Sequence, residues 1–128
     1  MKKRLVVQGR LSDAQLATLN DLFDVSVLPK TTALNDPDNH ALLAEVHGII
    51  GSGLAITPQL LDAAPNLEVI ATISVGYDNL PVEELTKRGI MLCNTPDVLT
   101  ETTADTGFTL IMATARRVVE LAKWVKAG

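Results

Sequence analysis

The chain has 128 residues, 47% of them hydrophobic and only 3% aromatic, which predicts an ordinary domain with a mainly aliphatic core. Eleven Lys and Arg stand against fifteen Asp and Glu, and the net charge of −4 excludes a cationic surface for nucleic acid or an anionic membrane. The single Cys93 excludes an internal disulfide and offers no metal-ligand spacing, which favours a reducing cytoplasm.

The basic and then apolar start of the chain superficially resembles a signal peptide. Its apolar run stops at Gln8, far too early for a signal core or a membrane span. We therefore expect a soluble protein that begins with a β-strand.

Short apolar runs alternate with helical patterns over the first hundred residues. Strands are expected at 5–8, 25–28, 48–52, 68–74 and 90–93, and helices at 12–23, at 41–46, after Thr57 and after Pro81. Ser12 is expected to cap the first helix and Gly89 to end the fourth. Strict alternation predicts an α/β fold, a doubly wound parallel sheet in the flavodoxin-like order 2-1-3-4-5.

The segment 100–127 breaks this rhythm, because apolar residues recur every three or four positions without a strand following. It is interpreted as one long helix of roughly 40 Å at 1.5 Å per residue, capped by Thr100. Its first half is apolar or small on nearly every side and needs neighbours. We expect a domain at 1–99 and a connecting helix at 100–128, leading to something absent from this chain.

Two glycine-containing turns follow neighbouring strands. Gly51-Ser52-Gly53-Leu54 begins like a dinucleotide fingerprint, but Ile56 stands where the third glycine belongs. A ligand-facing turn and a plain turn both remain open. The second turn, 74–79, can present consecutive N–H groups to an anion, with Asp78 and Asn79 holding it through their side chains, or it can be a simple connection.

A third motif, Asn94-Thr95-Pro96-Asp97, leads into a threonine-rich helix start that either caps the helix or presents hydroxyls to a ligand. Catalytic groups are scarce. His40 and His47 are expected to be structural or solvated, Cys93 to end a buried strand, and no nucleophile elbow surrounds any serine. The sequence predicts no catalytic residue and no metal site.

Three stretches together resemble the NAD(P)-dependent D-2-hydroxyacid dehydrogenase family, in its glyoxylate/hydroxypyruvate and 2-ketoacid reductase branch. They are Ile73-Ser74-Val75-Gly76-Tyr77-Asp78-Asn79-Leu80, Lys87-Arg88-Gly89-Ile90 and Asn94-Thr95-Pro96-Asp97, supported by 101–106 and Arg116-Arg117. The resemblance covers the whole chain. It implies a two-domain enzyme in which a Rossmann domain interrupts the substrate domain.

The resemblance also implies site residues. Backbone N–H groups of Val75 and Gly76 hold the substrate carboxylate, Leu54 lines the pocket, and Thr103 approaches the nicotinamide. The family's catalytic Arg, Glu and His match no position here. NAD or NADP is expected in the full-length parent and none in this chain.

These expectations describe the substrate-binding half of an oxidoreductase that transfers hydride between NAD(P)H and a small 2-keto acid. The chain alone is expected to be inactive and to form a homodimer through its last helix. The alternatives are a stand-alone flavodoxin-like binding module and an isolated or designed fold fragment without enzymatic role. Against a receiver-type module, no acidic cluster follows the first strand.

Overall fold

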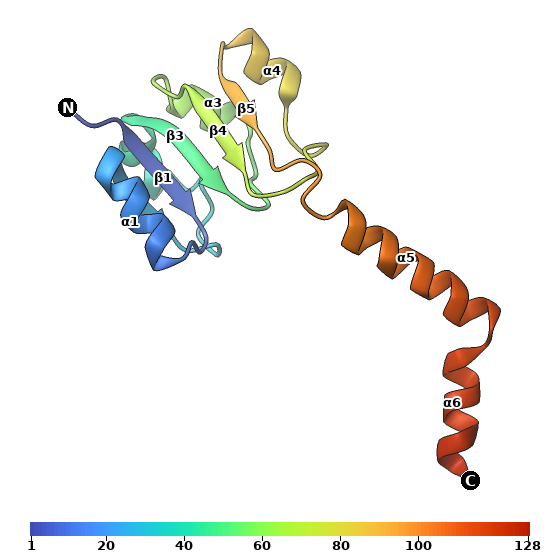
Figure 1. The fold of residues 1–128 in the computed structure, drawn as a ribbon. Coiled ribbons are helices and arrows are strands. Elements are labelled where there is room, and N and C mark those ends of the chain that lie inside the picture. The colour runs from blue at the N-terminus through green and yellow to red at the C-terminus, as the bar shows by residue number, and fades with distance from the viewer. The chain divides into compact units, whose positions relative to one another are not determined.

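The computed structural model describes residues 1–128 and contains a five-stranded, all-parallel sheet (Figure 1). The strands are β1 (Arg4–Gln8), β2 (Asp24–Leu28), β3 (Val46–Gly51), β4 (Val69–Thr72) and β5 (Met91–Cys93). The helices are α1 (Asp13–Leu22), α2 (His40–Leu43) after the 3-10 turn η1 (Pro37–Asn39), α3 (Pro58–Ala63), α4 (Val82–Lys87), α5 (Thr100–Ala115) and α6 (Val118–Ala127). The order β2-β1-β3-β4-β5 confirms the predicted fold class.

Local signals in the sequence set several helix ends. Ser12 forms a capping box, in which its hydroxyl accepts from the Gln15 amide (3.3 Å) and the Gln15 side chain accepts from the Ser12 amide (2.9 Å). The Thr57 hydroxyl accepts from the Leu60 amide (3.3 Å) and starts α3. Gly89 follows α4 with a φ of +71°, a left-handed conformation that favours glycine. These predicted boundaries are confirmed.

The hydrophobic core lies on one face of the sheet. Leu43 of α2, Leu60 of α3 and Leu85 of α4 are fully buried there together with Ile49 and Ile70 of the central strands. Helix α1 lies on the other face, in front of β1 in Figure 1, and contributes no fully buried residue. Helices on both faces give the doubly wound arrangement that keeps parallel strands away from water.

Two local expectations in this part of the chain are wrong. The second helix ends at Leu43 instead of 46, because the buried Val46 already begins β3. The Asn66 side-chain amide donates to the Ala44 carbonyl (2.8 Å), which would accept a backbone hydrogen bond if the helix continued. Cys93 is exposed rather than buried, because β5 is an edge strand with a neighbour on one side only.

The chain divides into two compact units, Met1–Thr95 and Pro96–Gly128. The second unit holds α5 and α6, so the single continuous helix predicted for this segment is wrong. Arg117 has the left-handed φ of +52°, and its guanidinium donates to Glu120 (Nε to Oε2, 2.7 Å). The chain therefore bends between α5 and α6 (Figure 1), and α6 begins where Leu121 donates to the Arg117 carbonyl (3.0 Å).

The expected cap of α5 is also wrong. Leu99 occupies the N-cap position, and no side chain accepts from the first amides, so Thr100 is already helical. No helix of the chain combines the length and apolar character needed to cross a bilayer.

Candidate functional site

The carboxyl edge of the sheet brings two turns together. Strands β3 and β4 are neighbours, so the segment after Gly51 and the segment after Thr72 leave the sheet side by side. The Asn79 side-chain amide donates to the Leu54 carbonyl (3.3 Å) and links them directly. In open α/β sheets, ligands bind in the crevice outside the carboxyl ends of the strands. This edge is therefore the candidate site.

Packing and backbone conformation explain the two glycines of the first turn. A Cβ on Gly51 would lie 2.7 Å from the Gln8 carbonyl oxygen and 2.8 Å from Cδ2 of Leu54, so close packing excludes a side chain. Gly53 has a φ of +66° and makes the turn. Helix α3 is only six residues long, and Thr57 already caps one of its first amides. These residues do not fit a dinucleotide pyrophosphate.

In the second turn, the peptide carbonyls are held by hydrogen bonds. The Ser74 carbonyl accepts from the Thr95 amide (3.0 Å), and the Val75 carbonyl accepts from Nδ2 of Asn94 (2.8 Å). The Gly76 carbonyl accepts from the Ser74 hydroxyl (2.7 Å). The orientation of three successive peptide planes is thereby fixed.

The amides of Val75 and Gly76 donate no hydrogen bond to any other group of the chain. In a trans peptide the N–H points opposite to the C=O, so both N–H groups point away from the donors that hold the carbonyls. A Cβ on Gly76 would meet only Oδ2 of Asp78, at 3.7 Å, and its φ is not positive. Neither packing nor backbone conformation requires glycine there, which leaves room for a ligand to approach the backbone.

The side chains expected to hold this turn act differently. Asn79 reaches across to Leu54 instead of folding back on its own turn, and Asp78 makes no hydrogen bond with the chain. The Leu54 side chain is 1% exposed and belongs to the hydrophobic core. Its carbonyl, rather than its side chain, is the part of Leu54 that reaches the second turn. A substrate contact of Leu54 stays a prediction.

Thr103 lies in the first turns of α5, in the second unit. The hydroxyls of Thr102 and Thr106 donate to the helix backbone, to Leu99 (3.1 Å) and Thr102 (2.9 Å). The Thr103 hydroxyl makes no hydrogen bond within the chain and lines a shallow groove with Gly107. It is available to a ligand, and its predicted contact with a nicotinamide stays a prediction.

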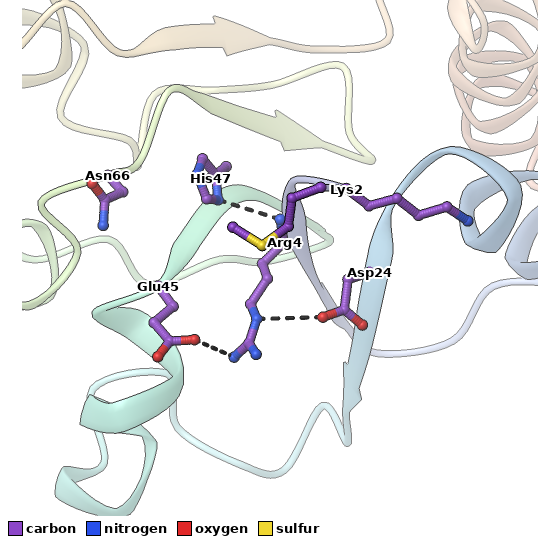
Figure 2. A pocket seen from close by; sticks show the side chains of 7 residues that line it. Lys2, Arg4, Asp24, Glu45, His47 and Asn66 are labelled. Atoms are coloured by element: carbon purple, nitrogen blue, oxygen red, sulfur yellow. Dashed lines mark hydrogen bonds and ion pairs between the residues drawn. The ribbon is translucent and has the colours of Figure 1, made fainter.

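A different cavity, of about 380 Å³, opens at the amino edge of the sheet (Figure 2). There the Arg4 guanidinium pairs with Glu45 (2.6 Å) and Asp24 (3.3 Å). Nδ1 of His47 accepts from the Arg4 amide (3.3 Å), beside a shift in the β1–β3 register. The Arg4, Asp24 and Glu45 charges at this cavity are paired with one another. The Lys2 ammonium donates to the Asn20 carbonyl (2.6 Å). The cavity therefore shows the features of a structural network rather than a binding site.

The remaining acid–base and metal candidates are not brought together. His40 is an exposed residue at the start of α2, and His47 lies at the edge opposite the two turns. No group of three or more His, Cys, Asp or Glu side chains is arranged to hold a metal ion. Asn94 has a larger part in the site than its motif indicated. Its place directly after the fifth strand and its motif drew attention to Asn94, but neither indicated a hydrogen bond to the Val75 carbonyl.

The fold and the paired turns define a flavodoxin-like α/β domain with free amides suited to a small anion at its carboxyl edge. The sequence model of the family described as "D-isomer specific 2-hydroxyacid dehydrogenase, catalytic domain" matches residues 5–127. The chain belongs to this family.

Relatives of known sequence support the same assignment. The chain is 48% identical over 128 residues to glyoxylate/hydroxypyruvate reductase B of Yersinia pestis (strain Pestoides F) and to that of Yersinia pseudotuberculosis. The match covers 100% of this chain and 39% of each reductase. The chain thus spans about two fifths of the length of these relatives.

Solved structures agree in fold. The PH0520 protein from Pyrococcus horikoshii OT3 aligns with a TM-score of 0.83 and 29% identity, over 100% of this chain and 38% of that one. The NADPH-dependent glyoxylate/hydroxypyruvate reductase from Sinorhizobium meliloti, solved with NADP and malonate, aligns with a TM-score of 0.74 and 35% identity. That alignment covers 100% of this chain and 39% of the reductase.

Proposed function

We propose that this chain is the substrate-binding part of an NAD(P)H-dependent reductase of small 2-keto acids such as glyoxylate and hydroxypyruvate. The 48% identity to glyoxylate/hydroxypyruvate reductase B over the full chain supports this substrate class. The rest of the enzyme, including a Rossmann domain that binds the nucleotide, would come from residues beyond those matched here. The single Cys93 is in keeping with a cytoplasmic enzyme.

The observation that carries the proposal is the pair of unpartnered amides at Val75 and Gly76. Two adjacent N–H groups with fixed peptide planes can each donate to one oxygen of a substrate carboxylate. Anchoring the carboxylate fixes the position of the neighbouring keto carbon, which lowers the entropic cost of reaching a reactive pose. The malonate in the Sinorhizobium meliloti structure is likewise a small carboxylate.

We propose that this chain binds the substrate and that the catalytic groups and the nucleotide site lie in the rest of the enzyme. When bound, the nicotinamide supplies the hydride, and we assign only Thr103, through the family resemblance, to its surroundings. No phosphate loop is present. His47 lies at the opposite edge of the sheet, and His40 is an exposed residue at the start of α2 with no contact that prepares it as a proton donor. The chain alone is therefore proposed to bind substrate weakly and to catalyse no reduction.

We also propose that the second unit mediates a homodimer. Its two helices bury none of their own residues, and they carry large apolar side chains along their length. An apolar surface of this extent is uncommon on a soluble monomer, and a second copy across a two-fold axis is the simplest cover.

The substitution Gly76→Val tests the carboxylate site. The new Cβ would meet only Oδ2 of Asp78, at an ordinary contact distance of 3.7 Å, so the fold should survive, but the side chain occupies the space beside the amide. In the complete enzyme, KM for glyoxylate should rise by at least tenfold, about 1.4 kcal/mol of lost binding, while KM for the nucleotide stays unchanged. An unchanged KM for glyoxylate in a folded variant would exclude Val75 and Gly76 as the anchor.

Activity of the 128-residue chain is a separate test. NADPH absorbance is followed at high protein concentration with glyoxylate or hydroxypyruvate. Reduction that survives repurification would show that the chain holds a catalytic centre of its own and would overturn the proposed division of labour.

A further inference from the structure

The donors that fix the second turn come largely from one side. Asn94 and Thr95 are consecutive residues that follow β5, and they hold the Val75 and Ser74 carbonyls respectively. Strand β4 lies between β5 and β3 in the sheet. Both carbonyls are therefore drawn toward the β5 side of the turn.

The direction of the amides follows from the same bonds. Because all peptide bonds are trans, a carbonyl drawn toward β5 sends the N–H of the same peptide the opposite way. The Val75 and Gly76 N–H groups consequently face the β3 side, where Asn79 already joins the two turns. The hydrogen bonds donated by the residues after β5 therefore also determine the direction of the free amides.

Each of the three peptide planes depends on a different donor. The Ser74–Val75 plane is held by a backbone amide, that of Thr95, which every substitution of Thr95 except proline leaves in place. The Gly76–Tyr77 plane is held by the Ser74 hydroxyl, which also shares a hydrogen bond with the buried Thr72 hydroxyl (2.7 Å). The Val75–Gly76 plane is held by the Asn94 side chain alone.

We infer that Asn94 is a positioning residue for substrate binding, whose carboxamide sets the direction of the Gly76 N–H. This inference rests on the proposed function, since it requires that the Gly76 amide donates to a carboxylate. Asn94 acts without touching the substrate. Losing its N–H donor frees the Val75–Gly76 peptide to rotate, so the carboxylate must bind a turn that is no longer ordered beforehand.

The chain offers a matched control for this role. The Asn66 side chain also donates to a backbone carbonyl, that of Ala44, over the same 2.8 Å. Asn66 precedes β4, at the amino edge of the sheet, and lines the cavity of Figure 2. Its loss removes a comparable hydrogen bond without affecting the second turn.

The experiment titrates oxamate, an unreactive 2-keto acid analogue, into the 15N-labelled chain and follows the Val75 and Gly76 amide signals by NMR. Asn94→Leu keeps the size of the side chain and removes the donor, so the affinity for oxamate should fall at least tenfold. Asn94→His restores an N–H at similar reach and should recover most of the affinity. Asn66→Leu should bind as the unsubstituted chain does.

In the complete enzyme, Asn94→Leu should raise KM for glyoxylate at least tenfold and leave KM for the nucleotide unchanged. A purely structural role would instead lower the amount of folded enzyme without this split. If Asn94→Leu loses its dispersed NMR spectrum, Asn94→Asp decides, because it keeps the shape but presents an acceptor to the Val75 carbonyl. It should lose affinity in the same way.

The outcomes separate the two claims. If the unsubstituted chain shifts its Gly76 signal and the folded Asn94 variants bind oxamate equally well, the positioning role is wrong and the carboxylate site stands. If oxamate shifts neither amide in the unsubstituted chain, the proposed carboxylate site is itself wrong, and the role of Asn94 is overturned with it.

Discussion

Asn79 donates its side-chain amide to the carbonyl of Leu54, and this one hydrogen bond of 3.3 Å joins the turns that follow β3 and β4. The two residues are 25 positions apart in the chain. Leu54 is anchored in the core by its buried side chain, so Asn79 fastens the more exposed second turn to a rigid point. The distance between the turns is therefore under the control of a residue that need not contact substrate.

The substitution Asn79→Ala should loosen the site more than the fold. At 3.3 Å the bond is long, so its loss should cost about 0.5 kcal/mol of unfolding free energy in urea, the low end for a hydrogen bond. Oxamate affinity, measured by NMR, should fall severalfold because the two turns are no longer held together. The control Asn66→Ala removes a shorter bond of 2.8 Å, so it should cost at least as much stability and leave the affinity unchanged. Equal affinities for both variants would contradict the prediction.

Gly51 and Gly76 should respond in opposite ways to alanine. In Gly51→Ala the new Cβ meets the Gln8 backbone at 2.7 Å, so the central strands must shift, and about 1–3 kcal/mol of stability should be lost. Gly76→Ala adds a methyl group that meets only Oδ2 of Asp78, at an ordinary 3.7 Å, and should change stability by less than about 0.5 kcal/mol. Urea unfolding of both variants measures this difference. Similar losses would show that the second turn is packed more tightly than the structure indicates.

The pH dependence of stability should include a contribution from Glu68. The hydrogen bond from the Lys3 ammonium lowers the pKa of the Glu68 carboxyl below its ordinary value of 4.5, assisted by the positive charge of Lys3 and opposed by desolvation. A carboxyl whose pKa is lowered by folding stabilises the folded state above the unfolded pKa. This stabilisation is lost as the pH falls through the folded pKa.

The substitution Lys3→Met should therefore return the pKa of Glu68 toward its ordinary value, as followed by NMR of its side-chain carboxyl carbon. The difference in stability between the two proteins should be present near neutral pH and shrink below about pH 4. The pair is solvent-exposed, so salt should reduce the effect. A difference that grows as the pH falls would contradict the assignment.

Much of the fold was predictable because each element carried its own signal. Ser12, Thr57 and Gly89 set helix ends by local hydrogen bonds or backbone conformation, which depend on few neighbours. The strand order followed from β-α alternation and the handedness of crossovers. The exposure of Cys93 was missed although the predicted strand order already placed the fifth strand at an edge, because the apolar run that forms this strand indicated burial on both faces.

The candidate site was predictable only in part, for a physical reason. Val75 and Gly76 belong to a motif of contiguous residues, so the resemblance could indicate them. The contributions of Asn94 and Asn79 depend on hydrogen bonds across 19 and 25 positions of the chain, which no local pattern encodes. The break at Arg117 was missed because its neighbours keep helical spacing, and only the left-handed φ of that one residue ends α5.

The second unit supports the riskiest prediction. Large apolar side chains on α5 and α6 lack cover from the unit's own residues, namely Phe108, Leu110, Ile111, Met112, Val119, Leu121 and Trp124. Leaving such side chains in water forgoes on the order of 1.5–3 kcal/mol each. A small domain has only about 5–15 kcal/mol of total stability, so the gain from covering them is large.

We predict that the chain forms a dimer through this unit at micromolar concentration and above. Light scattering over a dilution series should show twice the chain's mass at the concentrated end and a return to monomer on dilution. Replacing Phe108 and Ile111, which are three residues apart on one side of α5, with Glu should shift the midpoint to at least a hundredfold higher concentration. The reason is that dimerisation of this variant would bury two new carboxylates from each copy in the interface.

The control Lys123→Glu changes charge on the polar side of α6 and should leave the dimerisation midpoint within a fewfold of that of the unsubstituted chain. A monodisperse monomer at high micromolar concentration would show that these side chains need no second copy, and the dimer proposal would then be abandoned.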